Sequence, residues 1–228
     1  MVFIYFLANK IGSSVCHQIP SRTLVIGGIY LPLCGRTTGI YLGFLISAII
    51  LFFLFSKENE LASVYVLIIF FLLIASTAID WVLSHLGIYE SSNNIRFITG
   101  FLAGSSITAI IFPVFNRQYY QKSDDLKIFK SPIKLIVYFL ILIFFIIMTL
   151  LRLGFLSLFY YYLSAFSVIF TFYFVNLLMI ILIPMFANKA RRVISRYLIL
   201  PSVISLALTS LELFVFFKLN VFFSNLRA

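Results

Sequence analysis

Two polar stretches interrupt an otherwise apolar sequence and contain the side chains that could carry chemistry. The first covers residues 16–39 and the second residues 80–100. Together they supply soft ligands, guanidinium groups and potential acids and bases, namely Cys16, His17, Arg22, Cys34, Arg36, Asp80, Asn94 and Arg96. If the two stretches meet in the fold, we expect these residues to form one polar pocket.

The arginines point to anion binding, because the planar guanidinium fork matches phosphate or carboxylate. The predicted substrate-binding residues are Arg22, Arg36, Asn94 and Arg96. With His17 or Asp80 as the catalytic acid or base, this set predicts hydrolysis or transfer on a lipid-linked phosphate or another amphipathic anionic substrate. The structural alternative is that the arginines extend to lipid headgroups, or that Asp80 pairs with Arg96 to make its burial tolerable.

The thiols offer a second chemistry. Cys16, His17 and Cys34 could supply three ligands to zinc or another soft divalent metal, leaving a fourth position open. Adjacent ligands chelate together only from a bent backbone, which Pro20 makes possible. The two cysteines, 18 positions apart, could instead form a structural disulfide, act as a redox pair or remain free thiols. The sequence leaves these uses open.

Composition decides the class of protein that must position these residues. Of 228 residues, 63% are apolar or aromatic and 11% are charged, whereas soluble domains carry roughly 25% charged residues. A soluble globule is therefore excluded, and so is disorder, which requires few apolar residues and high net charge. The remaining class is an all-α, polytopic transmembrane helical bundle, and we expect a multi-pass protein of the cell membrane.

Net charge agrees with that class. The chain has 17 Lys and Arg against 7 Asp and Glu, a formal charge of +10. In a membrane protein such an excess reflects basic cytoplasmic loops and contact with anionic lipid headgroups. We therefore expect membrane lipids as partners and no nucleic acid.

Hydropathy predicts about six spans in a single membrane domain, 1–228. They lie near residues 39–55, 61–83, 97–115, 135–151, 165–187 and 197–217. Residues 155–187 form one apolar run, about 50 Å long as a helix, which exceeds a hydrocarbon core of about 30 Å. We therefore assign 155–164 to the interface. Residues 1–38 are mixed and form an extracytoplasmic cap, in which the short apolar segment 23–33 is re-entrant or interfacial.

Orientation follows from the basic loops. The two densest clusters of Lys and Arg, within residues 117–134 and 189–196, fall on one side of the predicted bundle. Cytoplasmic loops are enriched in these residues, so this side is placed in the cytoplasm. Both termini and both polar stretches then lie outside, where the expected pocket would open.

Two further patterns concern helix packing. Gly100 and Gly104 share a helix face and invite close approach of a neighbouring helix. In the last span, a polar stripe steps by three and four residues through Ser202, Ser205, Thr209 and Glu212. The stripe predicts either a buried hydrogen-bond line or a transport path, with Glu212 pairing with Arg152 near the outer surface.

These observations leave three classes of function. The first is a membrane enzyme acting on a lipid phosphate or similar anionic amphiphile, which the convergence of arginine, histidine and cysteine favours. The second is a transporter or permease subunit, in which the polar stripe would connect the pocket to the cytoplasm. The third is a structural or accessory subunit of a membrane complex.

A longer motif links the chain to a known family. Cys16-His17-Gln18 is followed by Ser21 to Leu24 and then by Pro-Leu-Cys-x-Arg-x-Thr-Gly-Ile-Tyr-x-Gly, beginning at Pro32. With Asp80 and the segment 93–100, this resembles a family of predicted prokaryotic membrane proteins catalogued as a domain of unknown function. The resemblance covers roughly the first 105 residues and implies a common fold type without an activity. Many relatives carry Cys-x-x-Cys where this chain has Cys34 followed by Gly35, Arg36 and Thr37, which disfavours a three-cysteine, one-histidine metal site.

Overall fold

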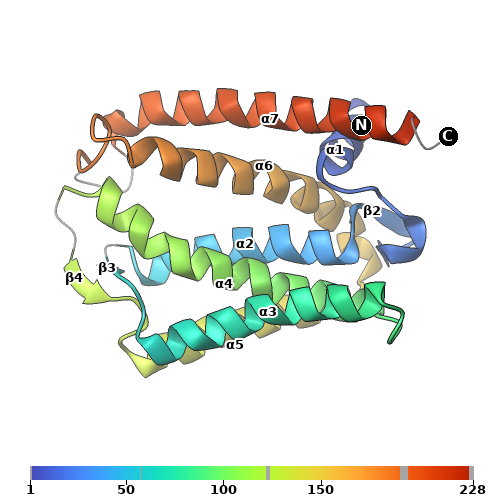
Figure 1. Cartoon of the computed structure of the whole chain (residues 1–228), viewed down its shortest axis with the longest axis horizontal. Helices are drawn as coiled ribbons and strands as arrows, with labels where there is room; N and C mark the ends of the chain where they lie inside the picture. Colours follow the sequence, from blue (N-terminus) through green and yellow to red (C-terminus); the bar gives the residue numbers. More distant parts are fainter. Residues whose placement is uncertain (1, 57, 122–123, 191–194, 226–228) are drawn as a thin grey trace.

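The computed structural model describes residues 2–56, 58–121, 124–190 and 195–225. Seven α-helices make up most of the described chain (Figure 1). They are α1 (Val2–Val15), α2 (Gly35–Leu54), α3 (Val64–His85), α4 (Asn93–Tyr119), α5 (Pro132–Leu150), α6 (Ser157–Ile181) and α7 (Ile199–Asn225). Single turns of 3-10 helix, η1 (Pro20–Arg22), η2 (Gly154–Leu156) and η3 (Arg196–Leu198), precede β1, α6 and α7.

Six of these helices, α2 to α7, are long and apolar enough to cross a membrane. They lie roughly parallel along the long axis of the molecule (Figure 1). The predicted all-α transmembrane bundle is therefore confirmed. The most apolar stretches of α2, α4 and α6 are more than half buried inside the protein, whereas those of α3, α5 and α7 are less than a quarter buried. The first three form the centre, and the others present apolar faces that suit lipid.

The structure corrects the predicted division of residues 155–187. α6 begins at Ser157 and continues without a break to Ile181, so residues 157–164 belong to the spanning helix and not to an interfacial piece. Tyr161 and Ser164 in this first part are fully buried, which shows that it packs against the bundle. The apolar run 155–187 is shortened at its C-terminal end instead, where α6 ends at Ile181 and residues 182–188 form turns around Pro184.

The centre of the bundle depends on a close contact between α2 and α4. A Cβ atom added at Gly104 would lie 2.0 Å from the carbonyl oxygen of Ile40, and one at Gly43 would lie 2.1 Å from that of Phe101. Neither position can accept a side chain without moving backbone. The glycines therefore allow the two helix backbones to touch, as the sequence predicted for Gly100 and Gly104.

The residues before α2 form a cap at one end of the bundle, beside both termini (Figure 1). The cap consists of α1, η1 and an antiparallel hairpin of β1 (Thr23–Ile26) and β2 (Ile29–Cys34). The apolar segment 23–33 thus lies within a β-hairpin. Gly27 and Gly28 turn it with φ of 55° and 79°, a conformation that two-residue hairpin turns require and glycine adopts freely.

The opposite end of the bundle is closed by loops. β3 (Glu58–Glu60) and β4 (Asp124–Lys127) pair there in parallel, joining the loop after α2 to the loop after α4. Figure 1 places them at the end away from the cap. The basic loops thus lie opposite the cap, in agreement with the order of spans assumed from the sequence.

Candidate functional site

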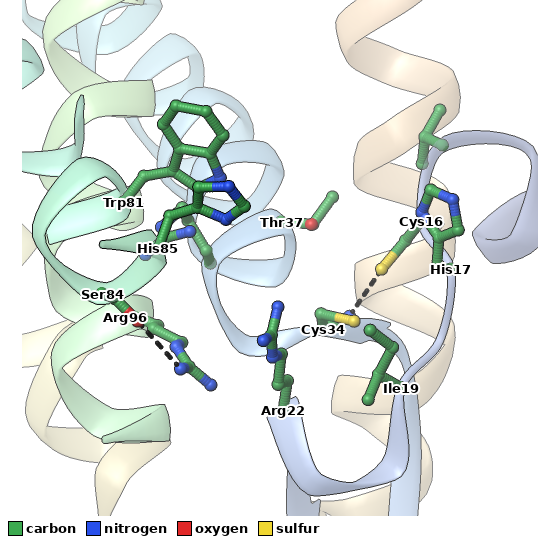
Figure 2. Close-up of a pocket in the computed structure, with 12 residues that line it drawn as sticks. Cys16, His17, Ile19, Arg22, Cys34, Thr37, Trp81, Ser84, His85 and Arg96 are labelled. Carbon is green, nitrogen blue, oxygen red and sulfur yellow. Dashed lines mark hydrogen bonds between the residues drawn. The ribbon is translucent and has the colours of Figure 1, made fainter. Parts of the chain in front are cut away.

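A cavity of about 260 Å³ lies between the cap and the bundle (Figure 2). It is formed where α1, η1 and the start of α2 face the end of α3 and the start of α4. Its lining residues are Val15, Cys16, His17, Ile19, Arg22, Cys34, Arg36, Thr37, Trp81, Ser84, His85 and Arg96. The two polar stretches of the sequence therefore meet, and six of the eight candidate residues line one cavity.

Local contacts hold the two stretches together. Ser92 caps α4 by accepting the backbone N–H of Ile95 at 3.2 Å, which is a favoured way to begin a helix. The next residue, Asn93, uses its amide nitrogen to donate to the carbonyl oxygens of Ser21 and Thr23, at 3.1 and 3.2 Å. These two carbonyls flank Arg22. The start of α4 thus fixes the backbone that presents Arg22 to the cavity.

Asp80 lies behind the cavity wall. Its side chain is buried and accepts three hydrogen bonds, from the guanidinium group of Arg36, from the hydroxyl of Tyr89 and from the hydroxyl of Ser91, the last at 2.6 Å. The structure corrects the predicted Asp80–Arg96 pair, because Arg36 is the partner. With both carboxylate oxygens engaged, Asp80 is a positioning residue for Arg36 and is poorly placed as an acid or base.

The other cavity arginines have weaker partners. Arg96 donates to the side-chain oxygens of Asn93 at 3.3 Å and Ser84 at 3.5 Å. Within the described ranges, Arg36 is the one cavity arginine that has a carboxylate within salt-bridge distance. Figure 2 shows Arg22 and Arg96 on opposite walls of the cavity. The cavity is therefore lined by guanidinium groups in excess of carboxylates.

Histidines stand on both sides of this arginine group. His17 is exposed on the cap, and His85 stacks on Trp81, with ring centroids 5.5 Å apart and planes 10° apart. We expected neither Trp81 nor His85 in the pocket. Their i, i+4 spacing on α3 places both on one helix face, which is the signal that could have found them.

The cysteines form a pair in the cavity wall. Cys16 Sγ accepts the backbone N–H of Cys34 at 3.1 Å and that of Gln18 at 3.5 Å. Both cysteines are free thiols. The hydrogen bond from the Cys34 thiol lowers the pKa of Cys16 to about 6, assisted by the two backbone N–H groups and opposed by burial. The same contact raises the pKa of Cys34.

The predicted metal site does not form in this arrangement. No three His, Cys, Asp or Glu side chains among residues 2–56, 58–121, 124–190 and 195–225 are grouped as metal ligands. Zinc sites take three or four such ligands. Cys16 and Cys34 interact with each other, and the residues present do not fit zinc or another soft divalent ion.

Two predicted contacts are replaced by others. Asn94 lies outside the cavity lining and accepts a hydrogen bond from Arg152 at 2.7 Å. Glu212, expected to pair with Arg152, instead accepts from Asn176 at 2.8 Å. Asn176 also donates to Thr209 at 3.1 Å. The polar stripe of α7 therefore forms a hydrogen-bond line against α6.

A second cavity, of about 380 Å³, adjoins the first. It shares Val15, Cys16 and His17 with the first cavity and reaches α7 at Asn220 and Phe223. Asn220 donates to the carbonyl oxygen of Ser13 and so ties α7 to α1. The polar cavity thus continues into a more apolar space between α1 and α7.

Comparison with known proteins supports a family assignment. A family described as "Predicted membrane protein (DUF2085)" matches residues 16–111. An uncharacterised protein of Methanocaldococcus jannaschii is 35% identical over 121 residues, which are 53% of this chain and 76% of the relative. An uncharacterised protein of Methanothermobacter thermautotrophicus is 36% identical over 96 residues, 42% of this chain and 83% of the relative. No solved structure matches significantly.

The family match also coincides with the site. Residues 16–111 include every residue that lines the first cavity except Val15. They comprise the cap after α1, the helices α2 and α3 and most of α4. The matched segment is thus the part of the chain that builds the cavity. This chain belongs to the DUF2085 family of predicted membrane proteins.

Proposed function

We propose that this membrane protein binds the phosphate-bearing headgroup of an amphipathic lipid in the cavity beneath the cap. The observation that carries the proposal is the gathering of Arg22, Arg36 and Arg96 from three separate segments around one cavity. One carboxylate, that of Asp80, accompanies these three guanidinium groups. The formal excess of two positive charges matches a phosphate monoester.

Arginine is suited to this role because its fork can donate two parallel hydrogen bonds to phosphate oxygens. Asp80 holds Arg36 from behind and leaves the opposite wall to Arg96. Arg96 has only long hydrogen bonds to neutral side chains, so a phosphate group would give it a stronger partner. Burying guanidinium groups without an anion is costly, and a bound headgroup would offset that cost.

The second cavity supports an amphipathic ligand over a free anion. It continues from Cys16 and His17 toward Phe223, and gives an apolar chain a place beside the headgroup site. The surrounding surface of α7 carries exposed apolar side chains such as Val215 and Leu219. A lipid could therefore place its phosphate between the arginines and its chain between α1 and α7.

His17 and His85 give the site its acid and base groups. For hydrolysis of a phosphate ester, water would form a bond to phosphorus, the bond to the ester oxygen would break, and an imidazole would carry the water proton to that oxygen. The arginines would stabilise the charge that develops on the phosphoryl oxygens. His17 is the better candidate because it lines both cavities.

The cavity belongs, in this proposal, to the extracytoplasmic side of the cell membrane. The loops that contain Lys127, Lys130, Lys189 and Arg196 lie at the end of the bundle opposite the cap. Basic loops favour the cytoplasmic side. The headgroup would then come from the outer leaflet.

Binding of phosphatidic acid to the full-length protein in nanodiscs, measured by native mass spectrometry, tests the proposal. Phosphatidic acid should bind at least tenfold more tightly than phosphatidylcholine. Arg96→Gln should lose about tenfold in affinity, since a charge-assisted hydrogen bond contributes about 1.5–3 kcal/mol and 1.4 kcal/mol corresponds to tenfold.

Arg117→Gln is the matched control. Arg117 is exposed in the last turn of α4, the helix that begins at the cavity, and the substitution removes the same charge. It should leave the affinity unchanged. Equal losses in the two variants, or no loss in either, would mean that the arginines only contact headgroups at the membrane surface.

A further inference from the structure

The two cysteines carry a feature that lipid binding does not use. Cys16 directly follows α1 and Cys34 ends β2, immediately before α2, so the cap brings together two thiols from different segments. The Cys34 thiol hydrogen-bonds to Cys16, and the backbone N–H of Cys34 donates to the same sulfur at 3.1 Å. Figure 2 shows the two sulfur atoms side by side.

The pair also lies in the wall of a cavity that a reactant could enter, with Cys16 buried and Cys34 partly exposed. Both cysteines line the first cavity, and Cys16 lines the second as well. Structural cysteines buried in apolar surroundings are inert, whereas reactive ones occupy electropositive and partly open environments. Here the sulfur of Cys16 receives two backbone N–H groups and shares its cavity with Arg22 and Arg36. The two backbone N–H groups stabilise a thiolate.

The unusual backbone conformation of Gln18 helps to direct one of these N–H groups toward Cys16. Gln18 has φ of 53°, which is unusual for a residue other than glycine. Its side-chain amide donates to the carbonyl oxygens of Asn9 and Pro32, at 3.1 and 2.9 Å, and so holds this conformation. The backbone N–H of Gln18 is thereby directed at Cys16 Sγ.

We infer that Cys16 and Cys34 form a redox-active dithiol that exchanges with the disulfide of a small thiol entering the cavity. The Cys16 thiolate attacks one sulfur of the small disulfide, which forms a mixed disulfide and releases one small thiolate. Cys34 then gives up its proton and attacks Cys16 Sγ. This step forms the Cys16–Cys34 disulfide and releases the second small thiolate.

Electrons and protons balance in this exchange. The protein gives up two electrons as its two sulfur atoms join, and the small disulfide takes them up to become one thiol and one thiolate, which takes a proton from water. The proton of Cys34 passes to a departing thiolate. The reverse reaction, with an excess of the small thiol, regenerates the dithiol. The pair is independent of the proposed lipid site, because it needs none of the three arginines as a ligand-binding group.

The test equilibrates the purified full-length protein with mixtures of reduced and oxidised glutathione, followed by acid quenching and intact mass measurement. The wild-type protein should pass from two free thiols to an intramolecular disulfide, and should return when the reduced form is in excess. Cys34→Ser should accumulate a glutathione adduct on Cys16. Cys16→Ser should acquire its adduct on Cys34 at least tenfold more slowly.

Three results would overturn the inference. They are a wild-type protein whose thiols stay free in every mixture, a disulfide that excess reduced glutathione does not reopen, and equal adduct rates in the two serine variants. Arg96→Gln serves as the control for independence from lipid binding. It should leave the exchange rate within about twofold of the wild type even where phosphatidic acid binding is lost.

Discussion

The two ends of the bundle each contain an ion pair, but they use it differently. At the cap end, Arg36 pairs with Asp80, whose side chain is 4% exposed. At the opposite end, Lys134 donates to Glu58 at 2.7 Å and to the carbonyl oxygen of Leu54 at 3.1 Å, and the lysine side chain is 41% exposed. One pair lies inside the wall of a cavity, and the other joins the start of α5 to β3.

At the opposite end of the bundle, side-chain donors bind the backbone carbonyl oxygens that are left without partners near the end of a helix. Besides Lys134, the buried amide of Asn116 donates to the carbonyl oxygens of Phe55 and Glu58, at 3.0 and 2.8 Å. Donors at this end are thus directed at backbone acceptors. A hollow at this end is lined by Lys127 and Lys130, among other residues. Both lysines are exposed, and neither has a carboxylate partner among the described residues.

The cap end of the bundle contains positive charge beyond what is needed to pair with backbone acceptors at helix ends. Arg36 and Arg96 are partly buried, and the side chain of Arg96 donates its hydrogen bonds to the neutral side chains of Asn93 and Ser84. A polar cluster in a membrane bundle therefore indicates a binding site when it keeps unpaired charge after the backbone groups at the helix ends have found hydrogen-bond partners. Four experiments test this difference between the two ends of the bundle.

The largest effect is expected for the ion pairs. Asp80→Asn should lower the free energy of unfolding by about 3–5 kcal/mol, because it leaves the partly buried Arg36 without its counter-charge. Glu58→Gln should cost at most about 1 kcal/mol, since its partner is largely exposed and retains a backbone acceptor. Denaturant unfolding in detergent micelles measures both. Similar losses in the two variants would remove the contrast between the ends.

The next effect concerns the spacing of the cavity walls. A Cβ atom at Gly100 would lie 2.4 Å from the carbonyl oxygen of Arg36. Gly100→Ala should therefore separate the start of α2 from α4, cost about 1–3 kcal/mol and abolish Arg96-dependent binding of phosphatidic acid.

Gly154→Ala is the matched control for this experiment. Its Cβ would meet the Cα of Gly27 at 3.5 Å, an ordinary contact at the same end of the bundle. It should change unfolding free energy by less than about 0.5 kcal/mol. If both alanine variants bind phosphatidic acid like the wild type, the α2–α4 spacing does not position the arginines.

The third effect is about tenfold in rate and uses Cys16 as a reporter of the cavity. Its pKa of about 6 means that thiolate is present above that pH and is lost as the pH falls through it. Alkylation of Cys16 by iodoacetamide should therefore be nearly constant from pH 7 to 8.5, whereas an ordinary thiol with a pKa of about 8.5 would accelerate about tenfold. The rate is followed by peptide mass spectrometry.

The Cys34→Ala variant tests the cause of this behaviour. The groups that face Cys16 are Cys34, His17, Arg22 and Tyr41. The Cys34 thiol contributes most to the lowered pKa, so its removal should shift the alkylation profile of Cys16 to higher pH. An unshifted profile would mean that the other groups of the cavity, and not the Cys34 thiol, lower the pKa of Cys16.

The smallest effect is expected for Tyr89→Phe. This change removes one of the three donors to Asp80 but keeps its ion pair. A cost of about 1 kcal/mol in unfolding free energy follows from the loss of one hydrogen bond. Circular dichroism during denaturant titration is sufficient to measure it. A loss as large as that of Asp80→Asn would make Tyr89, and not Arg36, the principal partner of Asp80.

Some features of the molecule are encoded in short stretches of sequence and others are not. The helical class and the approach of α2 to α4 at Gly100 and Gly104 were predictable, since both depend on residue types at short spacing. The partner of Asp80 was not, because Arg36 and Arg96 are chemically equivalent candidates. His85 was not among the residues expected in the pocket, although its i, i+4 spacing from Trp81 places both on one face of α3.

Amino-acid composition and hydropathy are sufficient to predict that this chain forms a bundle of apolar helices and where its polar residues are concentrated. Both properties act over short stretches of chain, through the transfer of apolar side chains from water to lipid. That Cys16 contacts Cys34, that Arg36 pairs with Asp80 and that Arg22 and Arg96 line opposite walls of one cavity follows from the packing of distant segments. Those contacts depend on how a hairpin and two helix ends pack together, and no local pattern of residues encodes that packing.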